Sequence, residues 1–206
     1  MITKKQLEIL KSFNKNLFKE YTFKEIKEIS KEKSNSVVQN AVKVFLDEEI
    51  IKERKIGNSK LYSINHENNK AYTYFEIIAN EEIGKLVKKS IKIVGEEINK
   101  KTSFYSLVIF GSYSVNENKK DSDLDVAVFI ESEDKRKLIE ACLNSAKLKS
   151  ILKIDGHVIV KNEFLEMLKA DYANLGKEIA KKHLAVYNSL IFYNILKEGI
   201  KNGFRL

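Results

Sequence analysis

The sequence predicts an α+β protein in two parts: a small basic helical domain that ends in a β-hairpin, and a larger domain in which helices flank a mixed sheet. Apolar residues recur at helical spacing in the first 45 residues and again from 67 to 101. A strand-like pair with a tight loop follows the first stretch, and further β-rich runs follow the second. The N-terminal part is the more basic, since residues 1–66 carry a net charge of +5 and residues 67–206 only +3.

The composition excludes several classes of protein. With 206 residues, 43% hydrophobic and 32% charged, the chain is expected to fold. No run approaches the roughly 18 apolar residues of a membrane span, and the first residues carry no leader pattern, so we expect a cytoplasmic protein with no membrane partner. A single cysteine, Cys142, excludes an internal disulfide and a cysteine-rich zinc site. The formal net charge of +8 is compatible with a polyanionic partner.

The first two helices are predicted from leucine spacing and from a capping sequence. Leu7, Leu10 and Leu17 favour a first helix. Thr22 and Glu25 stand in the S/T-x-x-E arrangement of a capping box, in which each side chain accepts a hydrogen bond from the other residue's backbone, and so they predict the start of a second helix.

A third helix is predicted to begin after Ser34 or Asn35, either of which can cap a helix N-terminus. Its buried side is predicted from apolar residues three and four positions apart over 38–45. The opposite side carries the polar residues Asn35, Ser36, Gln39, Asn40 and Lys43.

A β-hairpin is predicted to follow the third helix. Residues 50–56 and 60–64 are strand-like runs, and the loop between them, Gly57-Asn58-Ser59, tolerates the positive φ angles of a tight turn. Basic residues surround the turn, namely Lys52, Arg54, Lys55 and Lys60.

Three short helices followed by a basic hairpin resemble a winged helix-turn-helix domain, and residues 22–64 cover that motif. The resemblance implies that the third helix enters the DNA major groove, where amides read adenine edges and lysines meet phosphate. Glu49 stands where such domains often carry a glycine between helix and wing. Winged helices also serve as protein-docking or dimerisation modules, so this alternative stays open. The residues that the resemblance places on DNA are Ser36, Gln39, Asn40, Lys43, Lys55 and Lys60.

The chemistry is predicted from two strands and the loop between them. A β-rich run over 104–110 stops at Gly111-Ser112, and ten residues later Asp123 and Asp125 open a second run over 124–130. Alternation along a strand puts both carboxylates on one side, where two like charges are unfavourable unless a cation lies between them. Mg²⁺ suits these ligands, because it typically binds one or two carboxylates together with substrate phosphates.

Phosphate contacts and a third carboxylate complete the predicted site. Gly111 lets the backbone approach a phosphate, and the Ser112 hydroxyl can donate to a phosphate oxygen. Asp155 opens a third run over 154–160 and joins the other carboxylates if this strand lies beside the second. Two metal ions held there could activate an attacking hydroxyl and stabilise a leaving pyrophosphate.

A strand followed by Gly111-Ser112, ten residues, Asp123-x-Asp125 and a later Asp155 resembles the nucleotidyltransferase superfamily related to DNA polymerase beta, in its minimal branch, called MNT. The resemblance covers residues 102–161. It implies transfer of a nucleoside monophosphate, with AMP from ATP favoured, from a Mg²⁺-bound triphosphate to a hydroxyl. It also implies that Gly111 and Ser112 hold phosphate, and that the three aspartates bind metal. Asp155 would also help to deprotonate the acceptor.

Beyond the third strand the sequence predicts only helices, over 163–169 and 175–196, with a break in the longer pattern near His183. The predicted domains are a winged helix over 1–66, connecting helices over 67–101 that break at Asn80-Glu81-Glu82, a nucleotidyltransferase core over 102–161, and C-terminal helices over 162–206.

Two functions from different classes follow. In the first, the protein is an enzyme. Because MNT relatives are often antitoxins that modify a tyrosine of a partner HEPN toxin, the acceptor in one version is a protein. In the second, it is a DNA-binding transcriptional regulator whose transferase domain binds nucleotide without turnover. A two-fold symmetric DNA site favours a homodimer in either case.

Overall fold

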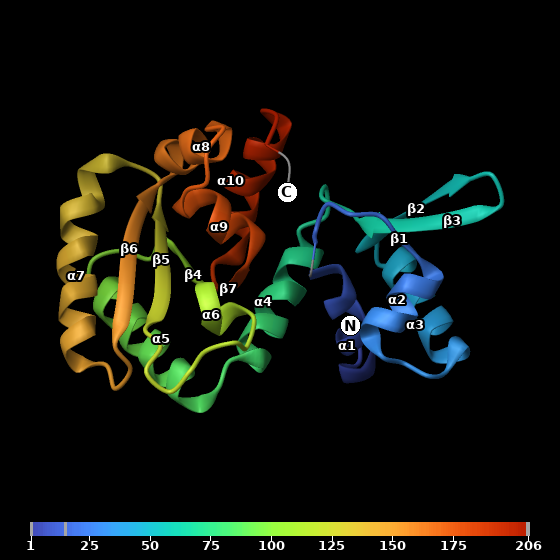
Figure 1. The fold of residues 1–206 in the computed structure, drawn as a ribbon, viewed down its shortest axis with the longest axis horizontal. Helices are drawn as coiled ribbons and strands as arrows, with labels where there is room; N and C mark the ends of the chain where they lie inside the picture. Colours follow the sequence, from blue (N-terminus) through green and yellow to red (C-terminus); the bar gives the residue numbers. More distant parts are fainter. Residues whose placement is uncertain (1, 15, 205–206) are drawn as a thin grey trace. The chain divides into compact units, whose positions relative to one another are not determined.

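The computed structural model describes residues 2–14 and 16–204, and the chain divides into two compact units, Met1–Ile78 and Ala79–Leu206. Figure 1 shows both. Among the described residues, no helix combines the length and apolar content needed to cross a bilayer. The elements of the first unit are α1 (Lys4–Asn14), β1 (Tyr21–Thr22), α2 (Phe23–Ser30), α3 (Asn35–Asp47), β2 (Ile51–Ile56), β3 (Ser59–Ile64) and the first part of α4 (Lys70–Glu82).

The predicted capping box at the start of α2 is confirmed. The Thr22 hydroxyl accepts from the Glu25 N–H at 3.2 Å, and the Glu25 carboxylate accepts from the Thr22 N–H at 2.8 Å. The hydrogen bond from the Thr22 backbone, followed by the one from Lys19, lowers the pKa of Glu25 to about 2.

The prediction for the first helix is wrong at its C-terminal end, because α1 stops at Asn14 and Leu17 lies outside it. The side chain of Asn16 accepts from the Phe18 N–H at 3.2 Å, and this local turn competes with helical hydrogen bonding. Leu17 is nevertheless buried.

Helix α3 is capped by Ser34, whose hydroxyl accepts from the Val37 N–H, and its apolar side is buried as expected. After α3, Glu49 takes the left-handed conformation with φ of 55° that a glycine adopts without strain. The side-chain amides of Asn65 and Asn68 donate to the Glu49 carbonyl at 2.9 and 3.1 Å, which fixes this turn.

Strands β1, β3 and β2 form an antiparallel sheet in that order. In the β2–β3 hairpin Ile56 pairs with Ser59, so the turn consists of Gly57 and Asn58, and β3 begins one residue before the predicted strand. Gly57 has the positive φ, 57°, that such a turn requires.

The second unit holds a four-stranded sheet in the order β6-β5-β4-β7, with β5 and β6 parallel and the other pairs antiparallel. Helices α5 and α7 cover one face, and α8 and α10 cover the other, where Phe164 and Phe192 pack on Phe129. The predicted mixed sheet flanked by helices is therefore confirmed. Its elements are α5 (Lys85–Asn99), β4 (Ser106–Phe110), α6 (Gly111–Ser114), β5 (Leu124–Ile130), a 3-10 turn (Glu133–Lys135), α7 (Arg136–Lys149), β6 (Ile154–Val160), α8 (Lys161–Lys169), α9 (Leu175–Lys181), β7 (His183–Tyr187) and α10 (Ser189–Lys201).

The prediction of helical structure throughout 175–196 is wrong over residues 183–187, which form strand β7 between two helices, whereas the expected break near His183 does fall at this point. The apolar residues of α9 and α10 keep a helical spacing on both sides of residues 183–187, so the sequence pattern favours a helix there. In the fold these residues pair with the free edge of β4 and form a strand instead. Asn188 ends the strand with a φ of 46°, and its side-chain amide donates to the carbonyls of Ser103 and Tyr105 at 3.1 and 3.0 Å.

Candidate functional site

The predicted site residues of the second unit meet at one edge of its sheet, where β4 ends and β5, β6 and β7 begin. Asp125 lies directly opposite Asp155 in the parallel β5–β6 pair, so the third strand does lie beside the second. On the other side of β4, Phe110, which precedes Gly111, pairs with His183 of β7.

The Asp125 carboxylate packs directly against Gly111. Its φ of 63° lies in the left-handed region, and a Cβ added to it would stand 2.2 Å from Asp125 Oδ2. No side chain other than hydrogen fits there. From its sequence position Gly111 is expected only to let the backbone approach phosphate, whereas in the structure the same glycine also makes room for a carboxylate.

Ser112 follows within the short helix α6 and is half-buried. The turn is held by the Ser114 hydroxyl, which donates to the Gly111 carbonyl at 2.7 Å. Over residues 2–14 and 16–204 the Ser112 hydroxyl makes no hydrogen bond, so it is available to a ligand.

Negative charge accumulates around Asp125. Partial burial is the main cause that raises the pKa of Asp125, and the charges of Asp155, Glu178 and Asp123 raise it further, while His157 acts in the opposite direction. A carboxylate in this environment gains from a nearby cation.

The other two aspartates have cationic or titratable neighbours. Lys153 Nζ lies 2.6 Å from Asp123 Oδ2, and this hydrogen bond is the main cause that raises the pKa of Lys153. His157 Nε2 lies 3.5 Å from Asp155 Oδ2. Within the described part of the chain, no three His, Cys, Asp or Glu side chains gather closely enough to hold a metal ion. The donor set nevertheless fits a hard cation such as Mg²⁺ in its chemistry, since it is all oxygen and negatively charged.

Sequence reasoning missed two residues of this site, Lys153 and Glu178. Lys153 stands two positions before Asp155, so strand alternation could have placed both on one side. Glu178 carried no such signal, because its approach to Asp125 depends on where α9 meets the sheet.

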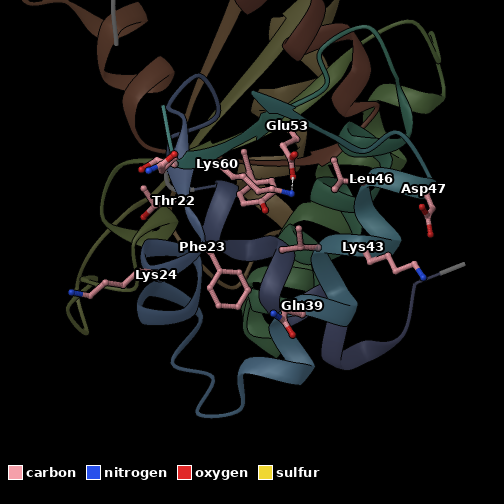
Figure 2. Close-up of a pocket in the computed structure, with 13 residues that line it drawn as sticks. Thr22, Phe23, Lys24, Gln39, Lys43, Leu46, Asp47, Glu53 and Lys60 are labelled. Atoms are coloured by element: carbon pink, nitrogen blue, oxygen red, sulfur yellow. Dashed lines mark hydrogen bonds and ion pairs between the residues drawn. The ribbon is translucent and has the colours of Figure 1, made fainter. Parts of the chain in front are cut away.

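The first unit has a groove of about 700 Å³ between the start of α2, helix α3 and the hairpin, drawn in Figure 2. Gln39, Lys43 and Lys60, three of the residues predicted to face DNA, line it. Lys60 Nζ is paired with Glu53 Oε2 at 3.0 Å. The other three predicted residues, Ser36, Asn40 and Lys55, are exposed but do not line the groove.

Comparison with known proteins bears on the second unit. Residues 87–187 match the family model described as nucleotidyltransferase domain. The matched range starts inside α5 and ends at the last residue of β7, so it contains the whole four-stranded sheet. No curated protein and no solved structure matches the chain. The match, the mixed sheet and the carboxylates at its edge together support a nucleotidyltransferase domain over residues 87–187.

Proposed function

We propose that the second unit transfers a nucleoside monophosphate from a Mg²⁺-bound nucleoside triphosphate, ATP being favoured, to a hydroxyl of an acceptor. One observation carries this proposal: Asp125 is seated against Gly111 and beside Asp155 at a sheet edge inside the range that matches nucleotidyltransferase domains. The match to a nucleotidyltransferase domain supports nucleotidyl transfer in general, without specifying the nucleotide or the acceptor.

The positions of the side chains support the roles that the resemblance to nucleotidyltransferases implies. The Gly111 backbone and the Ser112 hydroxyl hold phosphate at the end of β4. Asp123 and Asp125 would hold Mg²⁺, and Asp155 would add a third ligand and accept the proton of the attacking hydroxyl. Mg²⁺, when bound, supplies positive charge that activates the hydroxyl and stabilises the leaving pyrophosphate.

The test is a label-transfer assay with purified protein, Mg²⁺, each of four α-labelled nucleoside triphosphates, and cell lysate as the source of acceptors. Asp125→Asn should reduce transfer by about 100-fold or more, because it removes a charge at the metal. Asp121→Asn is the matched control, since Asp121 is an exposed carboxylate in the preceding loop. Equal transfer by wild type and Asp125→Asn would contradict the proposal, and so would no transfer with any nucleotide.

We further propose a protein acceptor, such as a HEPN-type toxin, on the strength of the MNT resemblance alone. The same assay tests it, because label that migrates with a protein and is released by phosphodiesterase identifies a nucleotidylated side chain. Label found only in nucleic acid or in small molecules would contradict a protein acceptor.

For the first unit we propose a winged helix that binds DNA, as a homodimer on a two-fold site. The five polar residues of α3 are all exposed, and Lys43 and Lys60 line the groove between α3 and the hairpin. Lys55→Ala should weaken binding to all sequences and reduce the slope of log K against log salt by about 1, whereas Gln39→Ala should relax sequence preference. A salt-independent affinity would contradict this proposal.

The second candidate function is a DNA-binding regulator whose second unit binds nucleotide without turnover. It is favoured by the ion pair of Lys153 with Asp123, which occupies one expected metal ligand. Salt-sensitive DNA binding that responds to ATP, together with no label transfer, would support it over the enzyme.

A further inference from the structure

Two short segments of the second unit are basic. Residues 83–95 and 141–154 contain seven of the 37 basic residues of the chain and no carboxylate. Helices α5 and α7 pack together through a shared core, and the Ser150 hydroxyl donates to the Ser90 hydroxyl at 2.9 Å. The end of α7 therefore lies against the middle of α5.

Large aliphatic side chains lie exposed in the same region. Leu86 is 51% exposed, Leu148 is 90% exposed and Ile151 is 67% exposed. Single exposed apolar residues are ordinary, whereas exposed apolar residues that lie close together are typical of interaction sites.

Several of the lysines there lack an ionic partner. Lys92, Lys149 and Lys153 pair with Glu96, Glu97 and Asp123. The remaining four make no ion pair with any residue that the structure describes. We call these four and the three aliphatic residues the basic–apolar surface: Lys85, Leu86, Lys88, Lys89, Lys147, Leu148 and Ile151.

This surface lies beside the candidate site. Lys153 follows Ile151 by two residues, its ammonium contacts Asp123, and its carbonyl accepts from the Leu124 N–H at 2.8 Å. A partner that covers Ile151 and Leu148 is therefore brought to the edge of the sheet that carries Asp123 and Asp125.

We propose that the basic–apolar surface docks the macromolecule that receives the nucleotidyl group, and that this partner is a protein with an acidic face bearing aliphatic side chains. The inference rests on the proposed transfer reaction. Lysines that lack partners select negative charge, and complementary charge mainly sets specificity and the rate of encounter. The exposed leucines and isoleucine select a protein over a nucleic acid, because single-stranded nucleic acids are bound by aromatic stacking instead.

The experiment measures binding of a synthetic amphipathic peptide that has leucines on one helical face and glutamates on the other, by fluorescence anisotropy with the full-length protein. The wild type should bind it, more weakly as salt is raised, and should bind the glutamine-for-glutamate peptide less tightly. The double variant Leu148→Asp with Ile151→Asp should lose about 10-fold or more in affinity. Leu138→Asp is the matched control, because Leu138 is 41% exposed at the other end of α7, and it should change affinity by less than about 2-fold.

Two further arms separate the alternatives. Asp125→Asn should bind the peptide as the wild type does, so a failure of the transfer reaction is distinguishable from a failure of docking. Anionic phospholipid vesicles and single-stranded DNA replace the peptide in parallel. The proposal would be overturned if the wild type did not bind the peptide, or if the double variant bound it as tightly as the wild type does. It would also be overturned if the double variant lost binding to vesicles or to DNA but not to the peptide.

Discussion

Gly111 links local backbone conformation to the chemistry of the site. Its φ of 63° and the 2.2 Å approach of Asp125 Oδ2 to the position of a Cβ both exclude larger residues. Gly111→Ala should therefore lose about 1 to 2 kcal/mol of stability from the left-handed backbone, and should displace the carboxylate, with a fall in transfer of about 100-fold.

The control for this change is Gly95→Ala. Gly95 lies inside α5, where the nearest atom to an added Cβ is 3.6 Å away, so the substitution should stabilise the protein by about 0.5 to 1 kcal/mol. Thermal unfolding and the transfer assay measure both variants. Full activity in Gly111→Ala would show that transfer does not require the close packing of Asp125 against Gly111.

Lys153 competes with any cation for Asp123, because its ammonium lies 2.6 Å from the carboxylate. Lys153→Gln should lower the Mg²⁺ concentration that gives half-maximal transfer by about 3- to 10-fold, since no ion pair then has to be broken. A titration of activity against Mg²⁺ measures this. A higher Mg²⁺ requirement in the variant would instead assign Lys153 to substrate binding.

At the scale of elements, β7 brings a partly buried histidine to the edge of the site. His183 Nδ1 lies 2.9 Å from the Ile179 carbonyl, Nε2 is buried, and the ring packs on Phe192 at 4.7 Å. Burial is the main cause that lowers the pKa of His183 to about 4. The neutral ring is therefore part of the folded state.

This lowered pKa predicts acid sensitivity. The unfolded chain takes up the proton of His183 near pH 6.5, and the folded chain takes it up only near pH 4. The stability that the neutral His183 ring contributes is therefore fully present above pH 6.5 and is lost as the pH falls toward 4. The loss should reach about 2 kcal/mol at pH 5. Urea unfolding at pH 7.5 and pH 5 should show this loss in the wild type and in His157→Gln, but a much smaller one in His183→Phe. Equal losses in all three proteins would rule out His183 as the cause.

At the scale of the whole molecule, the chain divides into two compact units, each with its own sheet. A ligand of the second unit should therefore protect that unit alone. Addition of Mg²⁺ and ATP should slow hydrogen exchange at the amides of β4 and β5, and the slowing should increase with ligand concentration. Exchange at the amides of β2 and β3 should stay unchanged. Equal protection in both units would show that they are energetically coupled.

Local signals in the sequence predicted much of this architecture. The bounds of β5 and β6 agree with the predicted runs, and the capping box of α2 was correct because its two side chains are only three residues apart. The sequence left it as a condition that the strand of Asp155 lies beside the strand of Asp125, and the structure meets this condition. The metal-ligand set and the roles of the site residues stay predictions.

What the sequence did not predict depends on contacts between distant residues. The strand at 183–187 exists because β4 offers an edge to pair with, a fact absent from its own periodicity. Lys153 and Glu178 join the site through the placement of β6 and α9, and Leu17 left its helix because of the turn at Asn16.

The late arrival of β7 has a consequence for synthesis of the chain. His183, which pairs with Phe110 of β4, lies about 70 residues later in the chain. A nascent or truncated chain that ends before β7 therefore leaves one side of β4 unpaired. Because a bare strand edge templates pairing with other chains, premature termination within α8 or α9 should yield aggregating fragments rather than a smaller folded protein.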